Sequence, residues 1–560
     1  MRMALSLLVS LLVCFALVQL AATSLPSVHR KGSVNYVTET KQFIFKDDYD
    51  DNAAATGTFK NEIAKSGWSY LNLKTNADYA DEIQAQAAGI LEARLTYDLI
   101  HATYLNTLAS YCPTPPPSSS SSYCRRLNDY LVAQRAFVDE MIAANGVGND
   151  FWHQVGLVYA QVDGLTKGYA EATVDKPDNA INKDFIYFSL GGDLEDLEVA
   201  LGAPDEVKSR VLGGGSCSAI IKLLPDKSEL FTAHDTWGPL SDMVRIYKRY
   251  EFSYRTAVAG DQVVPGSAMA FSSYPGSVVS GDDFYVVSSG LVAQETTNGN
   301  ENNELWKYVQ PRTVLEFVRS VVANRLAVSG ESWAKIFEQY NSGTYNNQWM
   351  IVDYKLFKAG EDLPANTLWI LEQIPGYVEY HDMTGVLKEK GYWASYNIPA
   401  FPTIFNMSGM PAMVKKYGDW FTHDKHPRAL IFARNQSSIT DLNSLYSLMR
   451  YNNYKHDPLS RCNCTPPYTG ENAIAARSDL NPSDGKYPFD ALGLRNHAAT
   501  DTKIVSSDMA PLLKSYAVSG PTHIQQPVFV WSESPLASTS HVGMPDRWDF
   551  DPEVIDWSKV

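Results

Sequence analysis

The chain has 560 residues, of which 45% are hydrophobic and 20% charged, with a formal net charge of −16 and a pI near 5.2. This apolar content excludes a disordered chain and is enough for one large domain or two to three ordinary ones. The acidic balance disfavours binding to nucleic-acid phosphates, so no nucleic-acid partner is expected.

The N-terminus has the features of a secretory signal peptide. Arg2 supplies a positive charge, residues 4–20 are apolar, and small residues follow at 21–23. We therefore predict a signal peptide over residues 1–23, and the alternative is an uncleaved anchor. No later stretch is apolar and long enough to cross a bilayer, so the mature chain is predicted to have no transmembrane segment.

The first part of the mature chain shows helical periodicity. Apolar residues recur at helical spacing over residues 82–110, 125–145 and 151–171. Residues 24–216 are therefore expected to form a mostly helical segment.

Six cysteines are present, and Cys14 leaves with the signal peptide. Cys112 and Cys124 flank the segment PTPPPSSSSSY, which is typical of a surface loop closed by a disulfide. A bridge between Cys462 and Cys464 is also considered, although the ring would be small. This pairing leaves Cys217 unpaired, as a reactive thiol, an intermolecular link or an inert buried residue.

The segment GGGSCSAIIKLLPDKSELFTAHDTW, from residue 213, predicts a strand, a tight turn and a second strand, with Cys217 at the start. A cut between Ser216 and Cys217 would free an α-amino group with an ordinary pKa of about 7.7–8. Nucleophile and base would then belong to one residue. The preceding glycines permit the backbone strain that attack of the Cys217 thiol on the Ser216 carbonyl requires.

Short strands are expected to continue to about residue 382, interrupted by a helix over residues 311–328 that has Pro311 in its first turn. The last hundred residues are rich in loops. Spacing indicates no metal-ligand cluster, and the two histidines of HDKH, residues 423–426, are interpreted as part of a solvated loop. Three acceptor sequons support a secretory route and begin at Asn406, Asn435 and Asn463.

Several sequence segments resemble those of the phospholipase B-like proteins, in the N-terminal-nucleophile hydrolase superfamily. They are CSAIIKLLPDKSELFTAHDTW, GYWASYNIPAFPTIFNMSG, KYGDWF, MRYNNYKHDPLS, ENAIAARSDLNP and SHVGMPDRWDF. The resemblance implies an α+β fold with a four-layer αββα core. It also implies autocatalytic cleavage before Cys217, with residues 24–216 and 217–560 remaining associated as one intertwined unit. The CNC spacing at 462–464 is tighter than in the family, which leaves that disulfide's geometry open.

The resemblance also implies a set of residues around Cys217, namely His234, Asp235, Trp237, Thr296 or Thr297, Asn397 and Arg428. The hairpin is expected to bring His234 to the thiol, with Asp235 on the opposite face.

Trp237 is expected back on the His234 face, as a wall of the pocket or as core. Asn397 is expected to donate to an oxyanion. Arg428 is expected to bind a substrate carboxylate or phosphate, or to pair with an acid. The threonines would bond the amine or the backbone.

We predict a secreted or lysosomal hydrolase that removes acyl chains from phospholipids without a cofactor. An amidase using the same thiol is the alternative, and a lysosomal lipid-binding protein without turnover is another. A serine lipase is disfavoured because GGSCS lacks the final glycine of its motif. A papain-like protease is disfavoured because no helix begins at Cys217.

Overall fold

The computed structural model describes residues 24–117, 120–205, 207–209, 211–212, 214–258 and 260–560. The expected signal peptide, residues 1–23, and Gly213 of the glycine run lie outside these residues, so the signal peptide stays a prediction.

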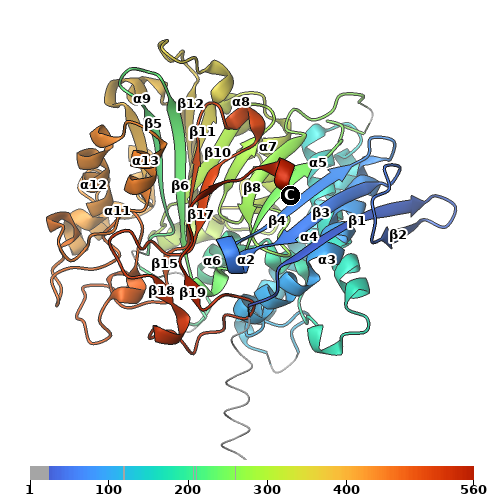
Figure 1. Cartoon of the computed structure of the whole chain (residues 1–560), viewed down its shortest axis with the longest axis horizontal. Helices are drawn as coiled ribbons and strands as arrows, with labels where there is room; N and C mark the ends of the chain where they lie inside the picture. The colour runs from blue at the N-terminus through green and yellow to red at the C-terminus, as the bar shows by residue number, and fades with distance from the viewer. Residues whose placement is uncertain (1–23, 118–119, 206, 210, 213, 259) are drawn as a thin grey trace, which may run out of the picture.

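Two β-sheets are stacked face to face, and helices cover both outer sides (Figure 1). Within the described residues the larger sheet has eleven strands, in the order β13 (Tyr377–Asp382), β12 (Leu368–Ile374), β11 (Asn347–Asp353), β10 (Leu291–Thr297), β9 (Phe284–Val287), β8 (Ala268–Ser273), β7 (Arg245–Glu251), β4 (Trp68–Thr75), β3 (Ala55–Asn61), β1 (Val28–Val37) and β2 (Gln42–Lys46). Neighbouring strands are antiparallel except β4 and β7, which are parallel.

The smaller sheet carries the strand that begins at Cys217. Its order is β14 (Tyr392–Ser395), β5 (Cys217–Leu223), β6 (Leu230–Gly238), β16 (Asp501–Val505), β17 (Tyr516–Ser519) and β20 (Glu553–Val554), with β15 (Ala498–Ala499) beside β6. A separate pair joins β18 (Phe529–Val530) and β19 (Arg547–Trp548).

Helices form the two outer layers. Those against the larger sheet are α3 (Asp81–Thr103), α4 (Ser122–Asn145), α5 (Asp150–Ala172), α6 (Gly191–Ala200), α7 (Glu316–Leu326) and α8 (Gly330–Phe337). Those on the side of the smaller sheet are α9 (Thr384–Lys390), α10 (Pro402–Met407), α11 (Met410–Tyr417), α12 (Pro427–Asn435) and α13 (Leu442–Met449). The short α2 (Ile63–Ser66) precedes β4. The predicted α+β, four-layer αββα arrangement is confirmed.

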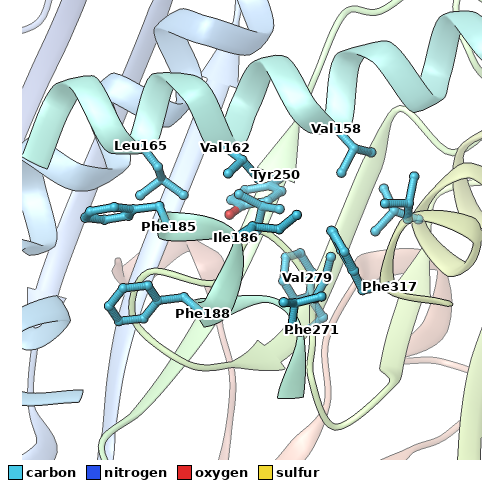
Figure 2. Close-up of a cluster of buried hydrophobic side chains, with 14 of the residues drawn as sticks. Val158, Val162, Leu165, Phe185, Ile186, Phe188, Tyr250, Phe271, Val279 and Phe317 are labelled. Carbon is cyan, nitrogen blue, oxygen red and sulfur yellow. The ribbon is translucent and has the colours of Figure 1, made fainter. Parts of the chain in front are cut away.

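Helices α3 and α5 cross with their backbones in contact, which glycine makes possible. A Cβ at Gly89 would lie 2.0 Å from the Gln161 carbonyl oxygen, and one at Gly164 would lie 2.3 Å from that of Gln86. The opposite side of α5 presents apolar residues to the larger sheet, where they pack on Tyr250 and Phe271 (Figure 2). Burial of this interface from water is the main stabilising term for the helical layer.

The three helices expected from periodicity are present as α3, α4 and α5, with α3 continuing into a π-helical turn (Tyr104–Leu108). The expectation of a mostly helical segment overlooked strands β1 to β4. Polar residues interrupt these strands, for example in VHRKGSVNYV, so alternation is weak there.

The hairpin at residue 217 is confirmed as β5 and β6. Pro311, however, does not lie in the first turn of a helix, because α7 begins at Glu316. The reason is a distant cap: the carboxylate of Asp193, in α6, accepts hydrogen bonds from the N–H groups of Glu316 and Phe317.

The predicted pairing of cysteines is confirmed. Disulfides join Cys112 to Cys124 and Cys462 to Cys464, and Cys217 is the free cysteine among the described residues.

Candidate active site

Cys217 is the first residue of β5 and is only 2% exposed. It pairs with Thr236 of β6, and alternation along the two strands divides the neighbouring side chains between two layers. Cys217, His234 and Thr236 face the larger sheet. Ser218 and Asp235 face the layer of α12 and α13. The thiol therefore lies between the two sheets.

The peptide bond before Cys217 is held by main-chain and side-chain groups on both sides. The N–H of Trp237 donates to the carbonyl oxygen of Ser216 at 2.6 Å. The side-chain oxygen of Asn397 accepts from the N–H of Ser216 at 3.2 Å and faces that of Cys217 at 3.5 Å. The carbonyl that the thiol would attack thus already has a hydrogen-bond donor, as a developing oxyanion requires.

Gly215 lets the segment before Cys217 pack closely against Trp237 and Arg428. Its N–H donates to the carboxylate of Glu471 at 3.1 Å. A Cβ at this position would lie 2.7 Å from the Trp237 ring and 3.0 Å from the Arg428 guanidinium. The glycine is therefore needed for close packing.

Asn397 follows β14 in a left-handed conformation, with φ of 69°. Its Nδ2 donates to the carbonyl oxygen of Thr297 at 2.8 Å, so its donor is engaged. Its oxygen faces the peptide bond before Cys217. The expected role as oxyanion donor is not the one this geometry offers, because the donor on the Ser216 carbonyl is the Trp237 main chain.

Arg428, in the first turn of α12, clamps the start of β5 to the segment after β14. Its Nη1 donates to the carbonyl oxygen of Cys217 and, at 3.3 Å, to Ser218 Oγ. Its Nη2 donates to the Tyr396 carbonyl at 2.6 Å and to Asn397 Oδ1 at 2.8 Å. Both terminal nitrogens are thus engaged by protein groups, which does not suit the expected binding of a substrate anion.

Arg428 is 1% exposed, and burial lowers the pKa of its guanidinium to about 10. The guanidinium lies 4.3 Å from the centre of the Trp237 ring. That ring is on the face of Asp235, not of His234, because it lies three positions after His234 and side chains alternate along a strand. The expectation of Trp237 on the His234 face is therefore wrong, although its backbone is at the site.

Glu295, in the middle of β10, is the site residue that the sequence interpretation missed. Its Oε1 lies 3.9 Å from the Cys217 sulfur and accepts from the Tyr345 hydroxyl at 3.1 Å. Its main-chain carbonyl accepts from His234 Nε2 at 2.9 Å. A charged residue inside the otherwise uncharged strand LVAQETT was the available signal.

Burial is the main cause of the pKa shifts of Cys217, His234 and Glu295. Burial, and then Glu295, raise the pKa of the Cys217 thiol well above its ordinary value. Burial, and then Lys503, lower the pKa of His234, while burial and then Asp283 raise that of Glu295. Each of the three side chains is therefore held toward its neutral form.

The remaining expected residues lie around this centre. The Thr296 and Ser395 hydroxyls are 2.6 Å apart, and Thr297 contributes the carbonyl that positions Asn397. Asp235 lies on the opposite face, as expected, where it accepts from the Thr502 hydroxyl.

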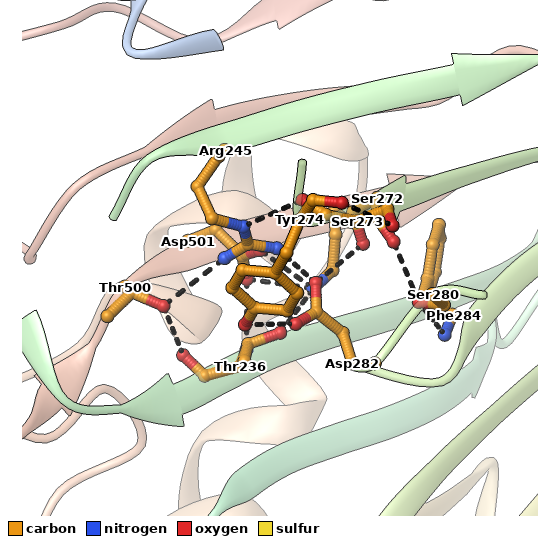
Figure 3. A network of polar contacts seen from close by, with 12 residues as sticks. Thr236, Arg245, Ser272, Ser273, Tyr274, Ser280, Asp282, Phe284, Thr500 and Asp501 are labelled. Carbon is orange, nitrogen blue, oxygen red and sulfur yellow. Dashed lines mark hydrogen bonds and ion pairs between the residues drawn. The ribbon is translucent and has the colours of Figure 1, made fainter. Parts of the chain in front are cut away.

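A buried ion network lies near Cys217 and joins the two sheets (Figure 3). Arg245 of β7 bonds Asp282 and, at 2.9 Å, Asp501 of β16. Lys503 bonds Asp501 and the Thr236 hydroxyl. Burial opposes ionisation of Asp282, but Arg245 and Lys503 lower its pKa to about 2. The opposite charges thus neutralise one another beside the thiol.

A pocket opens beside the peptide bond that precedes Cys217. Its wall includes Ser216, Asn298, Tyr396, Trp420, Phe421 and Arg428. Its volume is about 50 Å³, whereas ligand pockets span roughly 300–1,000 Å³. Residues 211, 214 and 216 form part of the wall, so this segment restricts the space beside the peptide bond that precedes Cys217.

The HDKH segment differs from the expected solvated loop. His426 is 1% exposed and caps α12 by accepting from the Arg428 N–H at 3.1 Å. Burial lowers the pKa of His423 to about 4. The segment therefore belongs to the wall of the site region, with only Asp424 and Lys425 exposed.

Two of the sequon asparagines, Asn406 and Asn463, are exposed, and Asn435 is half-buried. Over the ranges that the structure describes, no helix has both the length and the apolar character needed to cross a membrane.

Comparisons with known proteins agree on one family. The family profile described as Phospholipase B matches residues 55–555. The chain is 48% identical over 539 residues to the human protein named "Putative phospholipase B-like 2", which covers 95% of this chain and 90% of that protein. It is 40% identical over 515 residues to "Putative phospholipase B-like 1" of Caenorhabditis elegans, covering 90% and 88%. It is 35% identical over 532 residues to "Phospholipase B-like protein B" of Dictyostelium discoideum, covering 92% and 88%.

Proposed function

This chain belongs to the phospholipase B family, and we propose that it is a hydrolase that releases acyl chains from glycerophospholipids with Cys217 as its nucleophile. The observation that carries the proposal is the preparation of the bond before Cys217. The Ser216 carbonyl accepts from the Trp237 N–H, and Asn397 holds the two N–H groups around it.

In the proposed self-cleavage, Cys217 Sγ attacks the carbonyl carbon of Ser216. A C–S bond forms, the C–N bond breaks, and the nitrogen of Cys217 takes up the thiol proton. Water then hydrolyses the thioester, which leaves the Ser216 carboxylate and a free Cys217 thiol with a free α-amine. Trp237 N–H stabilises the oxyanion of the tetrahedral intermediate.

The freed amine can then act as the base for later turnovers. It takes the thiol proton as sulfur attacks the acyl carbonyl of the lipid, and passes it to the departing alcohol. Water hydrolyses the resulting acyl-thioester to release the fatty acid. Asn397 Oδ1 is placed to accept from the amine and so to orient it.

Cleavage would also enlarge the pocket, because a new chain end at Ser216 can move away from the thiol. The two fragments would stay together, since β4 of the first pairs along seven residues with β7 of the second. Disulfides and sequons support a route through an oxidising compartment, ending in the lysosome or outside the cell.

The test combines N-terminal sequencing with an activity assay on the secreted chain. The wild type is expected to yield a fragment that begins at Cys217 and to release fatty acid from phospholipid vesicles. Cys217→Ala is expected to stay uncut and inactive, whereas the matched variant Ser218→Ala, which alters the neighbouring side chain on the opposite face of β5, retains both cleavage and activity.

An N-acyl amide is included as a second substrate in the same assay. If fatty acid is released from the N-acyl amide but not from the phospholipid, the protein is an amidase and the phospholipase assignment is wrong. An active wild type in which residue 217 is still joined to residue 216 would overturn the proposal.

A further inference from the structure

Three side chains of metal-ligand type meet between the sheets, although they lie far apart in the sequence. Cys217 comes from β5, His234 from β6 and Glu295 from β10 of the facing sheet. One ligand atom from each, the thiol sulfur, a ring nitrogen and a carboxylate oxygen, lies within 4.8 Å of the other two. All three residues are buried. Local sequence spacing gave no sign of this cluster.

The state of His234 favours a metal ligand. A carbonyl oxygen only accepts, so Nε2 must carry the hydrogen in its bond to the Glu295 main chain. Nδ1 then keeps a lone pair, and it is buried without a hydrogen-bond partner among the described residues. A ring N–H donated to a backbone carbonyl is the arrangement that orients metal-binding histidines.

Glu295 shows a similar division of its two oxygens. Tyr345 donates to Oε1, while Oε2 is buried and unpartnered in the described part of the chain. An unpaired buried oxygen is unfavourable unless a proton or a cation satisfies it. Two of the residues in this cluster, His234 and Glu295, therefore each have an unsatisfied buried polar atom.

We propose that Cys217, His234 and Glu295 form a binding site for a borderline-soft divalent cation of the Zn²⁺ class. Sulfur, imidazole nitrogen and carboxylate oxygen are the three donor types that Zn²⁺ accepts, and three protein ligands leave a fourth position open. Binding releases the thiol proton, and the carboxyl proton of Glu295 where that group is neutral, to solvent, forms bonds from the metal to S, N and O, and involves no oxidation.

The neighbouring charges permit a cation here. Lys503 and Arg245 are near the cluster, but Asp501 and Asp282 pair with them in the buried network. Ser216, one residue before the sulfur ligand, lines the pocket and is not fully buried, which gives a short path for entry. A bound metal would occupy the sulfur and so block its attack on a carbonyl.

The site is tested on the secreted chain after chelation and dialysis, by titration with Zn²⁺ alone and with Co²⁺ alone. We expect one Zn²⁺ per chain and a thiolate-to-cobalt charge-transfer absorption. Cys217→Ala is expected to remove that absorption, and Glu295→Gln to weaken binding at least about tenfold. Thermal melting verifies that each variant is folded.

His381→Gln is the matched control, because His381 is exposed and pairs with the half-buried Glu379, so adventitious zinc would also bind there. Its Zn²⁺ affinity is expected to equal that of the wild type. Binding that is lost in His381→Gln, or kept in Cys217→Ala, would overturn the proposal, as would no binding at all.

The measurement does not use enzyme activity. Fatty-acid release without zinc binding would refute only the metal site, and zinc binding in a chain that hydrolyses nothing would refute only the proposed function. Where both are present, Zn²⁺ is expected to inhibit hydrolysis and a chelator to restore it.

Discussion

Substitution of Asn397 separates the positioning of the cleaved bond from the conformation of the loop. Asn397→Gly keeps the left-handed backbone but removes the oxygen that holds the N–H groups of Ser216 and Cys217. Two such bonds contribute about 1 kcal/mol each, so cleavage is expected to slow roughly 30-fold. The rate is followed by the appearance of the fragment beginning at Cys217.

Two further variants at this position make the interpretation specific. Asn397→Ala also lacks the oxygen but places a Cβ at positive φ, and its folded state is expected to be about 1 kcal/mol less stable than that of Asn397→Gly. Its cleavage rate should match that of the glycine variant, because the same contacts are missing.

Asn397→Asp keeps the acceptor and loses the donor to the Thr297 carbonyl. It is expected to cleave faster than Asn397→Gly while being destabilised by about 1–3 kcal/mol, since an oxygen would face an oxygen. Wild-type cleavage rates in both Asn397→Gly and Asn397→Ala, with normal fragments, would refute the positioning role.

Three other predictions rest on buried groups away from the thiol. Gly164→Ala is expected to lower the unfolding free energy, measured by denaturant titration, by about 1–3 kcal/mol, because its Cβ would lie 2.3 Å from a carbonyl oxygen. Gly148→Ala is the control and is expected to be neutral in the same titration, because its Cβ would have no atom within 4 Å. Burial raises the pKa of Glu372 to about 7. The contribution of Glu372 to folding stability is therefore complete below the pKa of the unfolded chain and is lost as the pH rises through 7. Glu372→Gln is expected to remove about 3 kcal/mol of the fall in unfolding free energy between pH 5 and 8, and an unchanged pH profile would contradict this. Glu471→Gln weakens the charge-assisted bond to the Gly215 N–H and is expected to slow cleavage roughly tenfold, measured by fragment formation.

The sequence predicted the parts of the site that depend on local pattern. The hairpin from Cys217 to Trp237 follows from two apolar runs around PDKS, and it brings His234 to the thiol. The prediction for Trp237 was wrong because residues three positions apart on a strand lie on opposite faces, and Trp237 was placed on the face of His234. Helices α3 to α5 were also predictable, since their apolar spacing is regular.

The rest depends on contacts between distant segments. Glu295 reaches Cys217 only because the two sheets stack, and no local pattern encodes that stacking. Strand β4 pairs with β7 across about 175 residues, which periodicity cannot detect. The start of α7 is set by Asp193 from another helix, so Pro311 was a misleading signal.

The thiol faces different proton acceptors before and after the proposed cut. In the intact chain the nitrogen of Cys217 is an amide without a basic lone pair, whereas among the described residues Glu295 and His234 each place a possible proton acceptor within 4.8 Å of the sulfur. Burial favours the neutral forms of the thiol and of both neighbours, so we expect the first proton transfer to be slow. Once the amine is free, a base with an ordinary pKa of about 7.7–8 is carried by the same residue. In the proposed mechanism the site would therefore carry out one slow acyl transfer to itself, followed by faster transfers from other molecules.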